Sequence, residues 1–120
     1  MIANELKEGD IIYNIWTYGD GNYHYAIYKV NFINENYDPL RVYIYAYILV
    51  SDWFDTSIQR FILSKNDNLN KLVLNSTTTF DDYYTTDESL FTSFLQKCED
   101  EKDIKGRTQP DENLVCTQIV

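Results

Sequence analysis

The sequence predicts a β-rich α+β fold, in which a curled antiparallel sheet is followed by one packed C-terminal amphipathic helix. Two observations lead to this prediction. Aromatic residues make up 16% of the chain, and 11 residues are tyrosines, which favour strands because they suit a pleated, half-buried surface. Apolar residues alternate with period two in residues 41–50, whereas after residue 85 they recur with helical spacing.

The length of the chain suits a single domain. Its 120 residues lie in the usual range, and its 44% of hydrophobic residues can form a core without disulfide or metal cross-links. We therefore expect one domain over residues 1–120. The sheet should cover about residues 10–84 and the helix about residues 86–104, and residues 110–120 should form a tail or a final strand.

The sheet is expected to begin with a β-hairpin. Residues 11–18 and 23–33 are predicted strands, and the turn between them contains Gly19, Asp20, Gly21 and Asn22, which are typical turn residues. Shorter strands are predicted over residues 58–63, 69–74 and 77–84.

Residues 41–50 form the clearest predicted strand, and its two faces differ. The even positions are aliphatic and are expected to point into the core: Val42, Ile44, Ala46, Ile48 and Val50. The odd positions carry a stripe of tyrosines: Tyr43, Tyr45 and Tyr47. This second face should be half exposed or covered by another element.

The helix is predicted from its first turn and from its apolar face. Thr85 is the expected N-cap, with Glu88 three residues later in a capping box. Gly106 is the expected end of the helix. The apolar residues share one face and should pack on the sheet: Leu90, Phe91, Phe94, Leu95 and Cys98.

Two segments resemble parts of known small proteins. The stretch LKEGDIIYNIW, followed by YAIYKVNFI, resembles the opening of SH3-like β-barrels. The stretch YYTTDESLFTSFL is similar to the end of small uncharacterised phage and mobile-element proteins, in which a helix follows such a barrel. The resemblance implies a curled antiparallel sheet or SH3-like barrel with a packed helix. It implies no activity and no functional residue.

The charge of the chain restricts its partners. The net charge is −9, which disfavours direct binding to nucleic acid and to anionic membranes and makes a basic protein a plausible partner. Eight acids and two lysines lie between residues 81 and 103, so the charge is concentrated around the helix. The start of the chain has no apolar segment typical of a signal peptide, which predicts a cytoplasmic protein.

No catalytic or metal-binding constellation is visible in the sequence. His24 is the single histidine, and Cys98 lies on the apolar helix face, where burial makes a thiol unreactive. One histidine and two distant cysteines cannot form a zinc site. We therefore expect no cofactor, no metal and no enzymatic activity.

Two groups of residues are candidates for an interaction surface. The first contains the tyrosines that share strand faces: Tyr23, Tyr25, Tyr43, Tyr45 and Tyr47. They either contact a partner or pack under the helix and in cross-strand pairs. The second contains the acids near the end of the helix: Glu99, Asp100, Glu101 and Asp103.

Three functions are compatible with these features. The first is a non-enzymatic interaction domain that binds a protein partner. The second is an inhibitor that mimics nucleic acid and presents the acidic helix to a basic protein. The third is a carbohydrate-binding or hydrolytic protein that uses tyrosines and paired carboxylates. The first is favoured because the sequence shows no catalytic or metal-binding constellation and its numerous carboxylates fit a solvated acidic face.

Overall fold

The computed structural model describes residues 1–55, 57–76 and 78–108, except for the side chains of residue 76 and of residues 103–108. A short 3-10 helix, η1 (Ala3–Glu5), precedes the sheet. The strands and the helix are β1 (Ile11–Thr17), β2 (Tyr23–Asn34), β3 (Arg41–Ser51), β4 (Ile58–Ser64), β5 (Val73–Ser76), β6 (Asp81–Thr85) and α1 (Glu88–Thr108). The expected tail or final strand over residues 110–120, which includes Cys116, lies outside the described residues.

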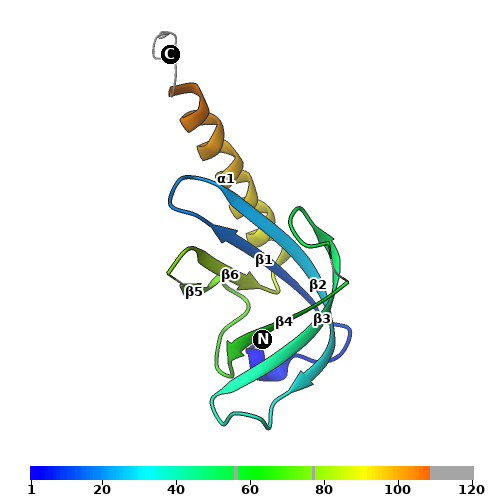
Figure 1. Ribbon diagram of the computed structural model, residues 1–120. Helices are drawn as coiled ribbons and strands as arrows, with labels where there is room; N and C mark the ends of the chain where they lie inside the picture. The colour runs from blue at the N-terminus through cyan, green and yellow to red at the C-terminus, as the bar shows by residue number, and fades with distance from the viewer. Residues whose placement is uncertain (56, 77, 109–120) are drawn as a thin grey trace.

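The six strands form one antiparallel sheet with the order β4-β3-β2-β1-β6-β5. The sheet is curled into a half-barrel, and α1 runs beside β1 and β6 and then extends past the sheet (Figure 1). The predicted fold class, a β-rich α+β fold with one packed C-terminal helix, is therefore confirmed.

The inner face of the half-barrel holds the main core. Its residues come from all four long strands and include Ile12, Tyr28, Val30, Ile44 and Leu63, each at most 1% exposed. Rings from opposite sides of the curl meet at Phe61 of β4 and Tyr84 of β6, whose centroids are 4.9 Å apart. This contact joins strands that are not hydrogen-bonded neighbours in the sheet.

The predicted core face of β3 is confirmed over most of the strand and is wrong at its end. Val42, Ile44 and Ala46 are fully buried, and Ile48 is half-buried against the core. Val50 is 48% exposed. The cause is a bulge: Tyr28 lies opposite Ile48 and Ile27 lies opposite Val50, so Leu49 is an extra residue. An extra residue reverses the alternation of faces after it.

The helix packs on the outer side of the sheet, as its apolar face predicts. Phe91 and Cys98 are buried with Ile15, and Phe94 and Leu95 lie around them, while Leu90 is half-buried. Two predicted helix boundaries are wrong, because the helix continues past Gly106 to Thr108 and its N-cap is Asp87 rather than Thr85.

The capping interactions explain the shift of the helix start. Asp87 Oδ1 accepts hydrogen bonds from the backbone N–H groups of Ser89 and Leu90, at 2.9 and 3.3 Å. Thr85 ends β6 instead, and its hydroxyl donates to the carbonyl of Leu69. Residues 69–72, which were expected to start a strand, form a turn that buries Leu69 completely against η1 and the core.

Candidate functional site

The tyrosines of β3 lie on the outer side of the half-barrel, on a part that α1 leaves uncovered. In an antiparallel sheet, directly opposed residues share a face. The register places the following residues in three rows across β2, β3 and β4: Lys29, Tyr47 and Ile58; Phe32, Tyr45 and Arg60; Asn34, Tyr43 and Ile62. We call these nine residues the outer tyrosine face.

The outer tyrosine face is apolar and exposed. Phe32 is 55%, Tyr47 44% and Ile58 48% exposed, while Tyr43 and Tyr45 are half-buried. Of the eleven large hydrophobic residues that are exposed in the described part of the chain, four belong to this face: Phe32, Tyr47, Ile58 and Ile62. Contiguous exposed apolar surface of this kind is typical of interaction sites.

The charges of this face differ from those of the chain as a whole. Lys29 and Arg60 belong to it, and none of its nine residues is acidic, although the net charge of the chain is −9. The guanidinium carbon of Arg60 lies 5.8 Å from the centre of the Tyr43 ring, a cation–π arrangement that keeps this cation on the face.

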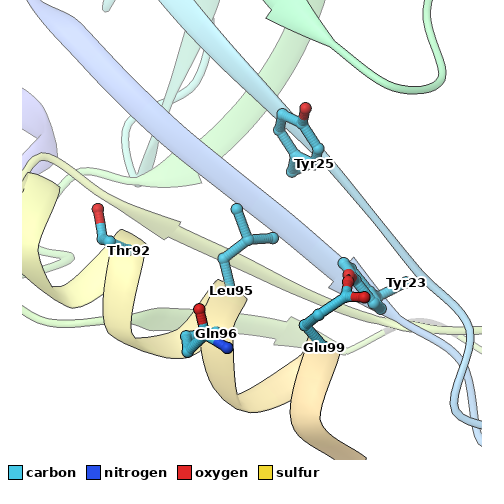
Figure 2. Close-up of a pocket in the computed structure, with 6 residues that line it drawn as sticks. All are labelled: Tyr23, Tyr25, Thr92, Leu95, Gln96 and Glu99. Carbon is cyan, nitrogen blue, oxygen red and sulfur yellow. The ribbon is translucent and has the colours of Figure 1, made fainter. Parts of the chain in front are cut away.

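Tyr23 and Tyr25, in contrast, lie under the helix. The Tyr25 ring lies 6.2 Å from that of Phe91, and the Tyr23 hydroxyl donates a hydrogen bond to Glu99. Burial and this carboxylate raise the pKa of Tyr23. An open pocket of about 300 Å³ separates the two tyrosines from Thr92, Leu95 and Gln96 of α1 (Figure 2). Tyr23 and Tyr25 are therefore half-buried and contact α1 in the structure.

The acids of α1 form a less uniform surface than the sequence suggests. Glu99 is engaged by Tyr23, and Asp100 accepts a hydrogen bond from Gln96. Asp100 and Glu101 are exposed, but Lys97 and Lys102 lie in the same segment. Lys102 Nζ lies 5.7 Å from the centre of the Tyr23 ring. The side chain of Asp103 lies outside the described residues.

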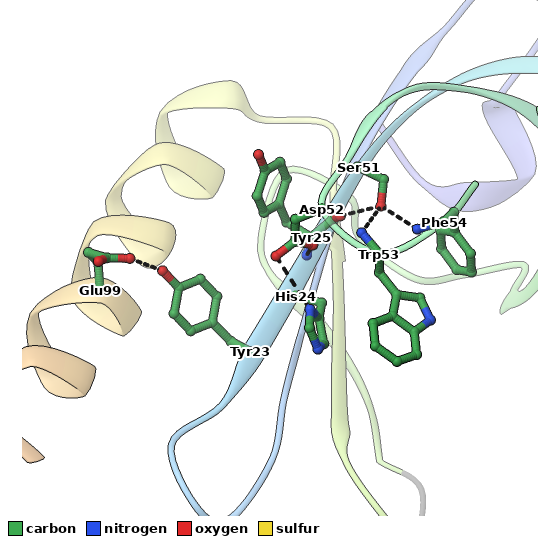
Figure 3. Close-up of polar contacts among 8 residues, drawn as sticks. All are labelled: Tyr23, His24, Tyr25, Ser51, Asp52, Trp53, Phe54 and Glu99. Atoms are coloured by element: carbon green, nitrogen blue, oxygen red, sulfur yellow. Dashed lines mark hydrogen bonds and ion pairs between the residues drawn. The ribbon is translucent and has the colours of Figure 1, made fainter. Parts of the chain in front are cut away.

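His24 belongs to a polar cluster at the inner side of β2 (Figure 3). Its Nδ1 lies 3.3 Å from Asp52 Oδ2, and its ring lies 4.5 Å from that of Trp53. Ser51 Oγ donates to the carbonyl of Tyr25 and accepts from the N–H groups of Trp53 and Phe54, so this hydroxyl fixes a turn.

Cys98 lies on the other side of the sheet from His24. Trp16, which is opposite His24, belongs to the inner core, whereas Cys98 packs beneath α1 with Ile15. Burial and the neighbouring Glu101 raise the pKa of the Cys98 thiol, which disfavours the nucleophilic thiolate. His24 and Cys98 therefore lie on opposite sides of the sheet and do not form a catalytic pair.

A second candidate site, which the sequence reasoning missed, opens on the inner side of the half-barrel. It is a cavity of about 440 Å³, and eight of its twelve described lining residues are aromatic. We call it the aromatic pocket and define it by Trp16, Tyr28, Trp53, Phe61, Asp82 and Tyr84. Asp82 is the one carboxylate among the described lining residues.

Asp82 is held by a hydrogen-bond network inside the half-barrel. Asn14 Nδ2 donates to Asp82 Oδ1 at 2.6 Å, and the Tyr84 hydroxyl donates to Asp82 Oδ2 at 3.0 Å. Burial raises the pKa of Asp82, and the two donated hydrogen bonds offset part of this effect. Within the described part of the chain, no lysine, arginine or histidine lies within ion-pair distance of this carboxylate.

A sequence signal for this site existed at Asn14. It lies between Ile12 and Trp16 on the core-facing side of β1, and a polar residue there needs a buried hydrogen-bond partner. No group of three or more potential metal ligands occurs among the described residues. No helix in the described ranges is both long enough and apolar enough to cross a membrane.

Comparisons with protein-family models, with curated proteins and with solved structures found no match to this chain. The resemblance to SH3-like phage and mobile-element proteins therefore stays a prediction.

Proposed function

We propose that the protein is a non-enzymatic interaction domain that binds a protein partner through the outer tyrosine face. The observation that carries this proposal is the exposure of Phe32, Tyr47, Ile58 and Ile62 on three adjacent strands, at 37–55% each. Aromatic and aliphatic side chains that lie together on a rigid sheet provide the central contacts of many protein interfaces.

The charges of the face indicate the chemistry of the partner. Lys29 lies in the row of Tyr47, and Arg60 lies in the row of Tyr45. A partner that places carboxylates opposite these two cations and an apolar surface between them would complement the face in both respects. Because the chain carries a net charge of −9, an acidic partner would be repelled by most of its surface and would bind preferentially at the face that carries Lys29 and Arg60.

The rival proposal is a nucleic-acid mimic that presents α1 to a basic protein. The net charge of −9 and the exposed carboxylates of Asp100 and Glu101 favour it. The interspersed Lys97 and Lys102 and the use of Glu99 by Tyr23 weaken it, because they interrupt a phosphate-like row of charges. A hydrolytic function with paired carboxylates is less favoured, since Asp82 has no second acid beside it among the described pocket residues.

The two proposals are separated by capture of partners from the native host with two matched variants. Phe32→Ser with Tyr47→Ser alters the outer tyrosine face, and Asp100→Asn with Glu101→Gln alters α1. Each pair changes exposed side chains only, so both variants should fold like the original chain.

We expect the partner captured by the original chain to bind the helix variant equally well. The face variant should bind it about tenfold more weakly or not at all, because it removes central apolar contacts. The affinities are to be measured with the purified partner. If the helix variant loses the partner and the face variant keeps it, the mimic becomes the better proposal.

A further inference from the structure

The aromatic pocket contains one carboxylate among its described lining residues, that of Asp82. Asp82 is half-buried, and no cation of the described residues lies within ion-pair distance of its carboxylate. A buried charge without a counter-charge destabilises a protein, so such a charge often serves a site rather than the fold. A bound cation would provide the missing counter-charge.

The polar groups around Asp82 are already occupied by one another. Asn14 Nδ2 donates to Asp82 and to the carbonyl of Tyr83, and Asn14 Oδ1 accepts from the Tyr28 hydroxyl. The Tyr84 hydroxyl donates to Asp82. These donors are therefore not available to the hydroxyl groups of a sugar or to an anion. The donors of this network are engaged, and the network contains the one carboxylate among the described lining residues.

The walls of the pocket are ring systems. The Trp16 ring lies 5.4 Å from the ring of Phe54, and the Tyr28 ring lies 4.9 Å from that of Phe61. Trp53, at the rim, is 59% exposed. The faces of aromatic rings carry partial negative charge and attract cations that need no hydrogen bond. The volume of about 440 Å³ is sufficient for a small organic ligand.

Arg60 is the cationic residue among the described lining residues, and it could neutralise Asp82 in place of a bound cation. It contributes to the rim of the pocket, but its guanidinium carbon lies 5.8 Å from the centre of the Tyr43 ring on the outer tyrosine face. The positive charge of Arg60 is therefore directed away from Asp82.

We propose that the aromatic pocket binds a quaternary ammonium group, with Asp82 as the counter-charge and the surrounding rings as the cage. A trimethylammonium group neither donates nor accepts conventional hydrogen bonds, which matches a network whose donors are engaged. Two sources share this chemistry, a free small molecule and a trimethylated lysine side chain of a protein.

The test is a calorimetric titration of the full chain with choline and with 3,3-dimethyl-1-butanol, its neutral isostere of the same shape. Choline should bind at least about tenfold more tightly, because only it carries the charge. A glycine-flanked trimethyllysine peptide and the same peptide with unmodified lysine identify the source. Tighter binding of the trimethylated peptide than of choline assigns the site to a protein side chain, and the reverse assigns it to a small molecule.

Variants link the binding to the pocket. Asp82→Asn keeps the shape of the side chain and should lower choline affinity at least about tenfold, while leaving the weak binding of the neutral isostere unchanged. Trp53→Ala should also weaken choline binding without changing the melting temperature, because Trp53 is exposed. Asp100→Asn removes one charge on α1, away from the pocket, and is the matched control that should bind as the original chain does.

Several results would overturn this inference. Equal binding of choline and the neutral isostere, or no binding of choline or of the trimethylated peptide, would show that the pocket does not select a cation. An equal loss of choline affinity in Asp82→Asn and Asp100→Asn would show that the affinity depends on the net charge of the chain and not on Asp82 in the pocket. Tighter binding of glucose than of choline would identify a sugar site instead.

Discussion

Replacement of Ile44 by alanine tests the inner face of the half-barrel. Ile44 is fully buried, between Ile33 of β2 and Phe61 of β4 in the register of the sheet. The substitution removes three carbons, each of which contributes about 0.8 kcal/mol when buried. The cavity that remains adds to this loss, so the free energy of unfolding should fall by about 2–5 kcal/mol. The melting temperature should then fall by roughly 10 °C or more.

The matched control for this substitution is Val50→Ala on the same strand. Strict alternation would place Val50 in the core beside Ile44, but the bulge at Leu49 turns it outward, where it is 48% exposed. Its replacement should cost less than about 1 kcal/mol. The assay is urea unfolding of both variants, monitored by circular dichroism. If Val50→Ala costs as much as Ile44→Ala, Val50 is buried, and neither the bulge at Leu49 nor the pairing of Val50 with Ile27 is correct.

Two predictions concern carboxylates and pH. Asp87→Ala should lower the melting temperature and Asp87→Asn should not, because only alanine removes the side chain that caps the helix. Hydrogen bonds hold the pKa of Asp87 low in the folded protein. The ionised carboxylate therefore stabilises the fold above the unfolded-state pKa of Asp87, and this stabilisation is lost as the pH falls through the folded-state pKa. Asp82→Asn should leave stability unchanged or raise it at neutral pH, because burial raises the pKa of Asp82, and the difference from the original chain should vanish as the pH falls and Asp82 is protonated. Thermal melts between about pH 7 and pH 3 check both, and a large loss of stability in Asp82→Asn at neutral pH would contradict the second.

The strand pattern of the sequence predicted most of the sheet, and its errors have local causes. Strands β1 to β4 lie within about two residues of the predicted ranges, since alternation and turn residues mark them. The bulge in β3 leaves no mark in the sequence, because Leu49 and Val50 are both apolar. The predicted strand over residues 69–74 begins too early, because Leu69 is an apolar residue like those that follow it in the strand. The burial of Leu69 in a turn depends on η1, which lies far away in the sequence.

The helix start shows a different limit of sequence reasoning. Thr85 and Asp87 are both good N-cap residues, and the local sequence does not choose between them. Pairing of β6 with β1 places Thr85 opposite Tyr13, which keeps the chain extended up to that residue. Thr85 is therefore held in β6, and Asp87, two residues later, caps the helix.

The candidate surfaces could be predicted only as residue types. Tyr23 and Tyr25 have the same alternating pattern as Tyr43, Tyr45 and Tyr47, yet α1 covers the first pair and leaves the other three. The direction in which the helix returns across the sheet decides this, and no local pattern encodes it. In the sequence, Asp82 is one of the eight acids between residues 81 and 103, and its partial burial depends on the pairing of β6 with β1.

The two proposed binding surfaces use opposite faces of the same curled sheet and opposite signs of charge. The outer tyrosine face carries Lys29 and Arg60, whereas the aromatic pocket carries Asp82. The backbone of the sheet separates them, and Arg60 is the one described residue that belongs to both. Substitutions at Phe32 and at Asp82 should therefore each report on a single surface. A substitution at Arg60 would alter a residue that contributes to the rim of the pocket and to the outer tyrosine face, so it cannot assign a function to either.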